Sequence, residues 1–154
     1  MSAIEAKLKE LGIVLPTPAA SVANYVGYVV TGNLVFVSGQ LPLEDGKIAV
    51  SGHLGKNVTI EDGYRAARIS AINLLAQLKA ATGGDLSRIK QVVRLTGFIS
   101  SAPDFTDQSK IINGASDLMV DVLGDAGRHA RISISVAALP MGAAVEVEGV
   151  FEIK

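Results

Sequence analysis

The 154-residue sequence contains no cysteine, and this absence alone excludes several classes of site. Disulfide bonds, thiolate nucleophiles and zinc sites built on cysteine cannot form. The two histidines, His53 and His129, stand far apart in the chain and lack the spacing of metal ligands. We therefore expect a protein whose chemistry uses neither a thiol nor a bound metal.

Charged residues are few, and neither sign is concentrated in one region. They make up 19% of the chain, the formal net charge is −1, and lysine and arginine are dispersed. Proteins that bind nucleic acids usually carry a basic stripe that contacts the phosphate backbone. The sequence therefore predicts no nucleic-acid partner.

Long hydrophobic runs are also absent, although 49% of the residues are apolar and the mean hydropathy is +0.38. No run approaches the roughly 18 residues that a membrane span needs, so no membrane partner is expected. Residues 1–12 carry two glutamates and two lysines instead of the apolar core of a secretory signal, and the cytoplasm is the default expectation. The apolar residues are spread over many short segments, which favours a large subunit interface.

The hydrophobic pattern predicts one domain over residues 1–154 with both helices and strands. A capping pattern at Thr59 and Asp62 begins a long helix, and the glycines Gly83 and Gly84 end it. The expected elements are a short helix at 3–11, a hairpin within 25–42, a short strand within 47–57, long helices within 59–84 and 101–124, and strands at 89–100 and within 128–140 and 143–153. Two long helices among mostly hairpin-linked strands indicate an α+β fold with both helices on one face of a mixed sheet.

The last two expected strands carry the most informative polar residues. In the first of them, polar residues alternate with apolar ones and share a face: Arg131, Ser133 and Ser135. In the second, the carboxylates share a face: Glu146, Glu148 and Glu152. If the two strands form a hairpin that turns at LPMG in an even register, the two polar faces coincide.

Two interpretations of such a face stay open on the pattern alone. The first is a solvated face of an antiparallel sheet, which is common and which the pattern by itself favours. The second is a site for a small anionic substrate. In that site an arginine grips a carboxylate through two hydrogen bonds, and a glutamate holds or activates water.

Three stretches of the sequence resemble the Rid family of reactive-intermediate (enamine/imine) deaminases, also called the YjgF family. They are NLVFVSGQLP (33–42), VVRLTGFISSAPDFTDQSKIINGASDLM (92–119) and ARISISVAALPMGAAVEVEGVFEI (130–153). The most specific feature is an arginine that opens a strand, followed by LP eight residues later and then by a VEVE strand. This resemblance, which runs from about Tyr25 to the C-terminus, favours a site over a solvated face.

The resemblance implies a chorismate-mutase-like α+β fold and a homotrimer with three equivalent sites in clefts between subunits. It implies hydrolysis of 2-imino or enamine acids to 2-oxo acids and ammonia, with no metal or organic cofactor. By position, Arg131 matches the carboxylate-binding arginine of the family, and Glu146 matches the glutamate that positions the attacking water.

Four further residues acquire substrate-binding roles through the same resemblance. Tyr25 matches a tyrosine that closes the pocket, and Gly39 contributes backbone contacts. Asn113 matches a polar residue that reaches the cleft from the neighbouring subunit. Ser133 lies where many members have cysteine.

The chain departs from the short family members in ways that indicate a longer branch. It has an N-terminal helical extension at about residues 1–20, an altered segment at 47–64, and Ile132 where serine is common. The identity of the substrate therefore stays open. Two other functions also stay open: a non-catalytic trimer that binds small carboxylates or acts like a chaperone, and an endoribonuclease or translation inhibitor. The pI of about 6.1 and the lack of a basic stripe count against the second.

Overall fold

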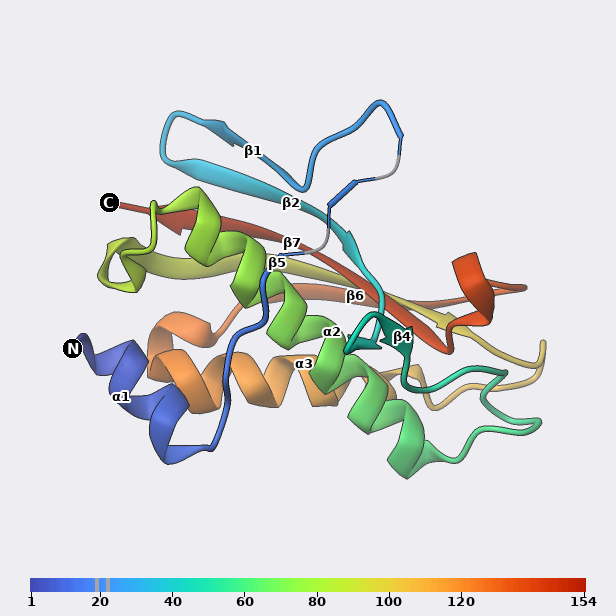
Figure 1. Cartoon of the computed structure of the whole chain (residues 1–154). Coiled ribbons are helices and arrows are strands. Elements are labelled where there is room, and N and C mark those ends of the chain that lie inside the picture. Colours follow the sequence, from blue (N-terminus) through green and yellow to red (C-terminus); the bar gives the residue numbers. More distant parts are fainter. Residues whose placement is uncertain (19, 22) are drawn as a thin grey trace.

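The computed structural model describes residues 1–18, 20–21 and 23–154, and a five-stranded sheet forms its centre (Figure 1). In spatial order the strands are β1 (Tyr28–Thr31), β2 (Leu34–Gln40), β7 (Val145–Ile153), β5 (Ile89–Ser100) and β6 (Ala130–Val136). A separate short hairpin consists of β3 (Leu43–Glu44) and β4 (Lys47–Ile48). The β5–β6 pair is parallel and the other pairs are antiparallel, so the sheet is mixed, as predicted.

Two long helices, α2 (Ile60–Ala81) and α3 (Gln108–Leu123), pack against each other and cover one face of this sheet (Figure 1). The threonine hydroxyl of Thr59 accepts a hydrogen bond from the backbone N–H of Asp62 at 3.1 Å, which confirms the predicted cap of α2. The helices approach closely because Gly114 of α3 lies against the backbone carbonyl of Tyr64, where a side chain would not fit. The predicted α+β fold is confirmed.

The N-terminal helix α1 (Ala3–Glu10) packs against α3, and Leu8 is buried in the core (Figure 1). It begins with a capping box, in which the side chains and backbone N–H groups of Ser2 and Glu5 bond reciprocally. Residues 15–18 then run beside the C-terminal half of α2. Of the helices that the structure describes, none is long and apolar enough to cross a membrane.

Three short 3-10 helices complete the described part of the fold: η1 (Leu86–Arg88), η2 (Gly124–Gly127) and η3 (Pro140–Gly142). The last of these connects β6 to β7 and brings the chain past β5 instead of reversing it into a tight hairpin. The prediction that β6 and β7 pair as a hairpin is therefore wrong. The crossover through α3 places β6 parallel to β5 at the sheet edge, and β7 inserts between β2 and β5.

This strand order also separates the two polar faces that the sequence predicted to coincide. On β5, Leu95 lies opposite Arg131 and Phe98 lies opposite Glu146. Neighbouring strands place directly opposite residues on the same face, and residues an odd number apart point to opposite faces. Leu95 is buried beneath the helices, so Arg131 lies on the helix-covered face and Glu146 on the open face.

Candidate functional site

Arg131 at the start of β6 has its guanidinium oriented by two side chains of α3. Its Nη1 donates to Oδ1 of Asn113 at 2.8 Å and to Oγ of Ser116 at 3.1 Å. Both hydrogens of Nη1 are thereby used, whereas Nε and Nη2 have no acceptor among the described residues. Nor does any carboxylate of the described residues lie within 4.0 Å of this guanidinium. Arg131 thus presents a planar pair of donors and an unpaired positive charge, which suits a ligand carboxylate.

Ser133 lies on the same face of the sheet as Arg131, and Asn113 belongs to the helix α3 that covers this face. Ser133 pairs with Gly97 of β5, and a side chain at Gly97 would collide with Ile112 of α3. The Oγ atom of Ser133 is buried and has no hydrogen-bond partner in the described part of the chain. Asn113 contacts the arginine of its own chain, although the resemblance predicted a contribution from the neighbouring subunit. These residues form the arginine group: Asn113, Ser116, Arg131 and Ser133.

The sequence analysis considered His129 only as a metal ligand and did not predict its contact with the arginine group. Its Nδ1 lies 2.6 Å from the carbonyl oxygen of Gly127, and its Nε2 lies 2.8 Å from Oγ of Ser116. Ser116 was missed as well. It lies three residues after Asn113 and therefore on the same side of α3, but no motif marks the pair.

Glu146 on the open face lies over the backbone of Gly39. The pairing of β2 with β7 is irregular between Val37 and Gln40, and there a β-carbon on Gly39 would lie 2.5 Å from Oε2 of Glu146. Burial raises the pKa of the Glu146 carboxyl above its usual range, and the nearby negative charge of Glu148 adds to this effect. A glutamate of this kind can take and return a proton nearer neutral pH than an exposed one.

Tyr25 and Gly39 line one cavity of about 180 Å³ beside this glutamate. Tyr25 is 56% exposed, and the hydroxyl of Ser38 donates to the carbonyl oxygen of Val26 at 2.6 Å. Met141 of η3 closes another side of the cavity with its backbone in the left-handed region, at φ 58°. Tyr25, Gly39 and Glu146 form the glutamate group.

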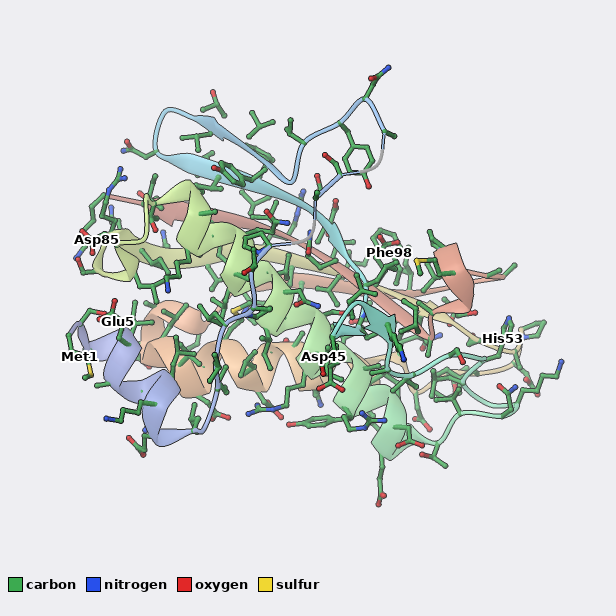
Figure 2. The ribbon with its side chains drawn as sticks, viewed as in Figure 1. Met1, Glu5, Asp45, His53, Asp85 and Phe98 are labelled. Atoms are coloured by element: carbon green, nitrogen blue, oxygen red, sulfur yellow. The ribbon has the colours of Figure 1, made fainter. Side chains whose placement is uncertain are left out.

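The segment after β4 supports the turn that carries Met141. The backbone N–H of Gly52 donates to the carbonyl oxygen of Gly142 at 3.0 Å. His53 lies at the end of the molecule remote from the N-terminus (Figure 2), and its Nε2 is 2.9 Å from the carbonyl oxygen of Ala137. This histidine therefore ties two loops together. Within the described residues, no three histidine, aspartate or glutamate side chains are grouped in a way that could hold a metal ion.

The six residues predicted from the sequence thus fall into two groups, and the arginine and the glutamate after which the groups are named lie on opposite faces of one sheet. The arginine group can hold a carboxylate, and the glutamate group can hold water and transfer a proton. Within one chain the two groups do not meet, so the prediction that Arg131 and Glu146 line the same surface is wrong. The cause is the position of β5 between their strands.

The family described as "YjgF/chorismate_mutase-like, putative endoribonuclease" matches residues 5–152. The chain is 48% identical to protein TCP17 of Trypanosoma cruzi over 151 residues, which is 97% of this chain and 94% of the relative. It is 30% identical to the RutC family protein y4sK of Sinorhizobium fredii over 133 residues, which is 86% of this chain and 90% of the relative.

A similar solved structure is that of protein Atu1372 from Agrobacterium tumefaciens, which is described as having unknown function. The two share 51% identity and superpose with a TM-score of 0.93, covering 99% of this chain and 93% of the other. The mixed sheet with two helices on one face and the match over nearly the whole chain define a single class of protein. The chain belongs to the YjgF/chorismate-mutase-like family, as its resemblance to Rid proteins predicted.

Proposed function

We propose that this protein hydrolyses 2-imino acids, and the enamines in equilibrium with them, to 2-oxo acids and ammonia. The proposal rests on one observation, the hydrogen bonding of the Arg131 side chain. Its guanidinium is oriented by Asn113 and Ser116, has no carboxylate partner among the described residues, and leaves Nε and Nη2 available. Those two donors match the two oxygens of a small carboxylate.

We propose further that each complete site forms between two subunits of a homotrimer. The open face of the sheet exposes large apolar side chains that a monomer would leave in water: Val29 is 54% exposed, Phe36 44% and Ile132 52%. A second copy of the chain that covers this face would bury them. The arginine group of one subunit and the glutamate group of the next then supply the two halves that lie apart within one chain.

The proposed chemistry needs orientation and one held water, since a protonated imine is already electrophilic. Arg131 binds the substrate carboxylate and fixes the position of the C2 atom. The oxygen of a water molecule forms a bond to C2 while Glu146 accepts a proton from the water. The electron pair of the C=N bond moves onto nitrogen, which gives a neutral carbinolamine.

The carbinolamine then collapses to products. Glu146 returns its proton to the amino nitrogen, the C–N bond breaks with its electron pair on nitrogen, and the remaining hydroxyl becomes the carbonyl of the 2-oxo acid. The hydroxyl proton passes to the ammonia that leaves, so the products are a 2-oxo acid and ammonium. No electrons are gained or lost overall, and the reaction consumes one water.

A coupled assay tests the proposal. A pyridoxal-phosphate-dependent dehydratase converts threonine to the 2-imino acid, and 2-oxobutanoate release is followed with lactate dehydrogenase. Wild-type protein should accelerate release, and Arg131→Ala should abolish the acceleration. Arg131→Lys should also be strongly impaired, because an ammonium lacks the planar pair of donors. The control is Arg128→Ala, which removes an exposed arginine 3.6 Å from Asp125 and should behave like the wild type.

Two results would contradict the proposal. Unchanged release with any imino acid, together with retained Arg131-dependent binding of 2-oxobutanoate, would indicate a carboxylate-binding trimer without turnover. Cleavage of RNA by the wild type, with no effect on imines, would favour the endoribonuclease activity that the family description carries. Purified protein, a panel of threonine- and serine-derived imines and a labelled RNA distinguish these outcomes.

A further inference from the structure

We infer that Ser116 and His129 are positioning residues, which hold the guanidinium of Arg131 so that it binds a carboxylate through Nε and Nη2. This inference rests on the proposed carboxylate-binding role of Arg131. In this inference the two residues act through Arg131 and not by contact with the ligand.

The hydrogen-bond chain has a defined direction. A backbone carbonyl can only accept, so Nδ1 of His129 carries the hydrogen that it shares with the oxygen of Gly127 at 2.6 Å. In the neutral imidazole Nε2 is then an acceptor, and the hydroxyl of Ser116 donates to it at 2.8 Å. The hydrogen of Ser116 therefore points away from Arg131.

This direction leaves the lone pairs of Ser116 Oγ for the arginine. Nη1 of Arg131 donates to that oxygen at 3.1 Å and to Oδ1 of Asn113 at 2.8 Å, so both of its hydrogens are used. The guanidinium plane is thereby fixed, and a carboxylate can form two parallel hydrogen bonds only at the edge made by Nε and Nη2. Without the acceptor in His129, the Ser116 hydroxyl could turn its hydrogen toward Arg131 and lose this contact.

Two substitutions of His129 separate this role from a purely structural one. The amide nitrogen of asparagine takes the place of Nδ1, so His129→Asn keeps the bond to Gly127 and loses the acceptor for Ser116. The amide of glutamine reaches the place of Nε2, so His129→Gln keeps an acceptor for Ser116 and loses the bond to Gly127. Positioning through Ser116 predicts that the glutamine variant behaves like the wild type and the asparagine variant does not.

The first measurement is binding of 2-oxobutanoate by calorimetry, which needs no turnover. We expect His129→Asn and Ser116→Ala to weaken binding about three- to tenfold, which corresponds to the usual net contribution of one hydrogen bond. His129→Gln and Ser116→Thr should restore it. In the imine assay the same variants should raise KM by a similar factor and leave kcat within about twofold, because the lost interaction fixes the carboxylate in ground and transition states alike.

The second measurement is the rotation of the Nη1 amino group of Arg131 about the Cζ–Nη1 bond, which exchanges its two hydrogens and is followed by NMR of the labelled side chain in the absence of ligand. It should be slow in the wild type and in His129→Gln, and faster in His129→Asn and Ser116→Ala. An asparagine variant with wild-type rotation and binding, or a glutamine variant that alone is impaired, would show that His129 only holds η2 and would overturn the inference.

The two proposals fail in different ways. A wild type that does not accelerate imine hydrolysis, but whose Arg131 rotation and 2-oxobutanoate binding respond to His129→Asn, would refute the deaminase and support the positioning role. An active wild type in which the His129 and Ser116 variants change neither rotation nor KM would refute the positioning role and support the deaminase.

Discussion

The carboxylate of Glu146 rests on Gly39, with no room between them for even one methyl group. Gly39 lies at the irregularity in the β2–β7 pairing, so the strand that forms the cavity wall also sets the position of the glutamate. The role of Gly39 is thus steric as well as a matter of backbone contacts.

Replacement of Gly39 by alanine should displace the Glu146 carboxylate, because the new β-carbon would lie 2.5 Å from Oε2. We expect kcat in the imine assay to fall about 10- to 100-fold, as for other small displacements of catalytic groups, with little change in 2-oxobutanoate affinity. In a Glu146→Gln background the same substitution should have little further effect on rate. Additive losses in that double variant would mean that Gly39 acts independently of the glutamate.

The acid limb of the pH–rate profile should depend on Glu148. Glu146 must be ionised to accept a proton from water, and the negative charge of Glu148 contributes to the raised pKa of Glu146. Glu148→Gln should therefore lower the pKa of Glu146 and move the acid limb of kcat/KM to lower pH. A limb that stays in place, or moves upward, would assign it to another group.

Stability should respond to pH through the same glutamate. Because the pKa of Glu146 is raised on folding, the native state retains a proton that the unfolded chain has already lost. The native state is therefore favoured below the ordinary carboxyl pKa, and this contribution is lost as the pH rises through the pKa of folded Glu146. Thermal unfolding should show Glu146→Gln to be more stable than the wild type at neutral pH, with the difference disappearing toward acidic pH.

Sites shared between subunits predict recovery of activity from two inactive variants. Arg131→Ala and Glu146→Gln subunits mixed at equal concentration, unfolded and reassembled, should regain about a quarter of the wild-type rate, since one neighbour pair in four combines an intact arginine with an intact glutamate. Each variant reassembled alone is the control. Mixtures that stay inactive, although mass spectrometry shows mixed oligomers, would place both groups of a working site in one subunit.

The sequence was sufficient to predict the α-helices and the longer strands, but not β3 or the 3-10 helices. Local signals determined them: the cap at Thr59, the glycines after Ala81, and the alternation in β7 whose apolar side chains are buried. Local signals could not predict that β6 pairs with β5, because strand order depends on the crossover through α3. Contacts far apart in the sequence then decide which face each strand presents.

The sequence named six candidate residues, whose functional roles stay predictions, but it did not reveal how they are arranged. The spacing from Arg131 to Glu146 marks the family, but it does not show that the two side chains leave the sheet on opposite faces. Ser116 and His129 carried no recognisable motif because their importance comes from hydrogen-bond direction. The exposed Ile132 likewise became informative only when the structure placed it on the face opposite the helices.

Through the hydrogen bond from Gly52 to Gly142, the loop after β4 affects the wall of the Tyr25–Gly39 cavity, although the loop does not line that cavity. It fixes the turn on which Met141 holds its left-handed backbone, a conformation that costs a non-glycine residue about 1 kcal/mol or more unless its surroundings maintain it. A family member with a different loop at this point would present a different residue, or the same residue differently, to the cavity. Chains with the same arginine and glutamate can therefore diverge in substrate through changes in length and sequence well outside the pocket.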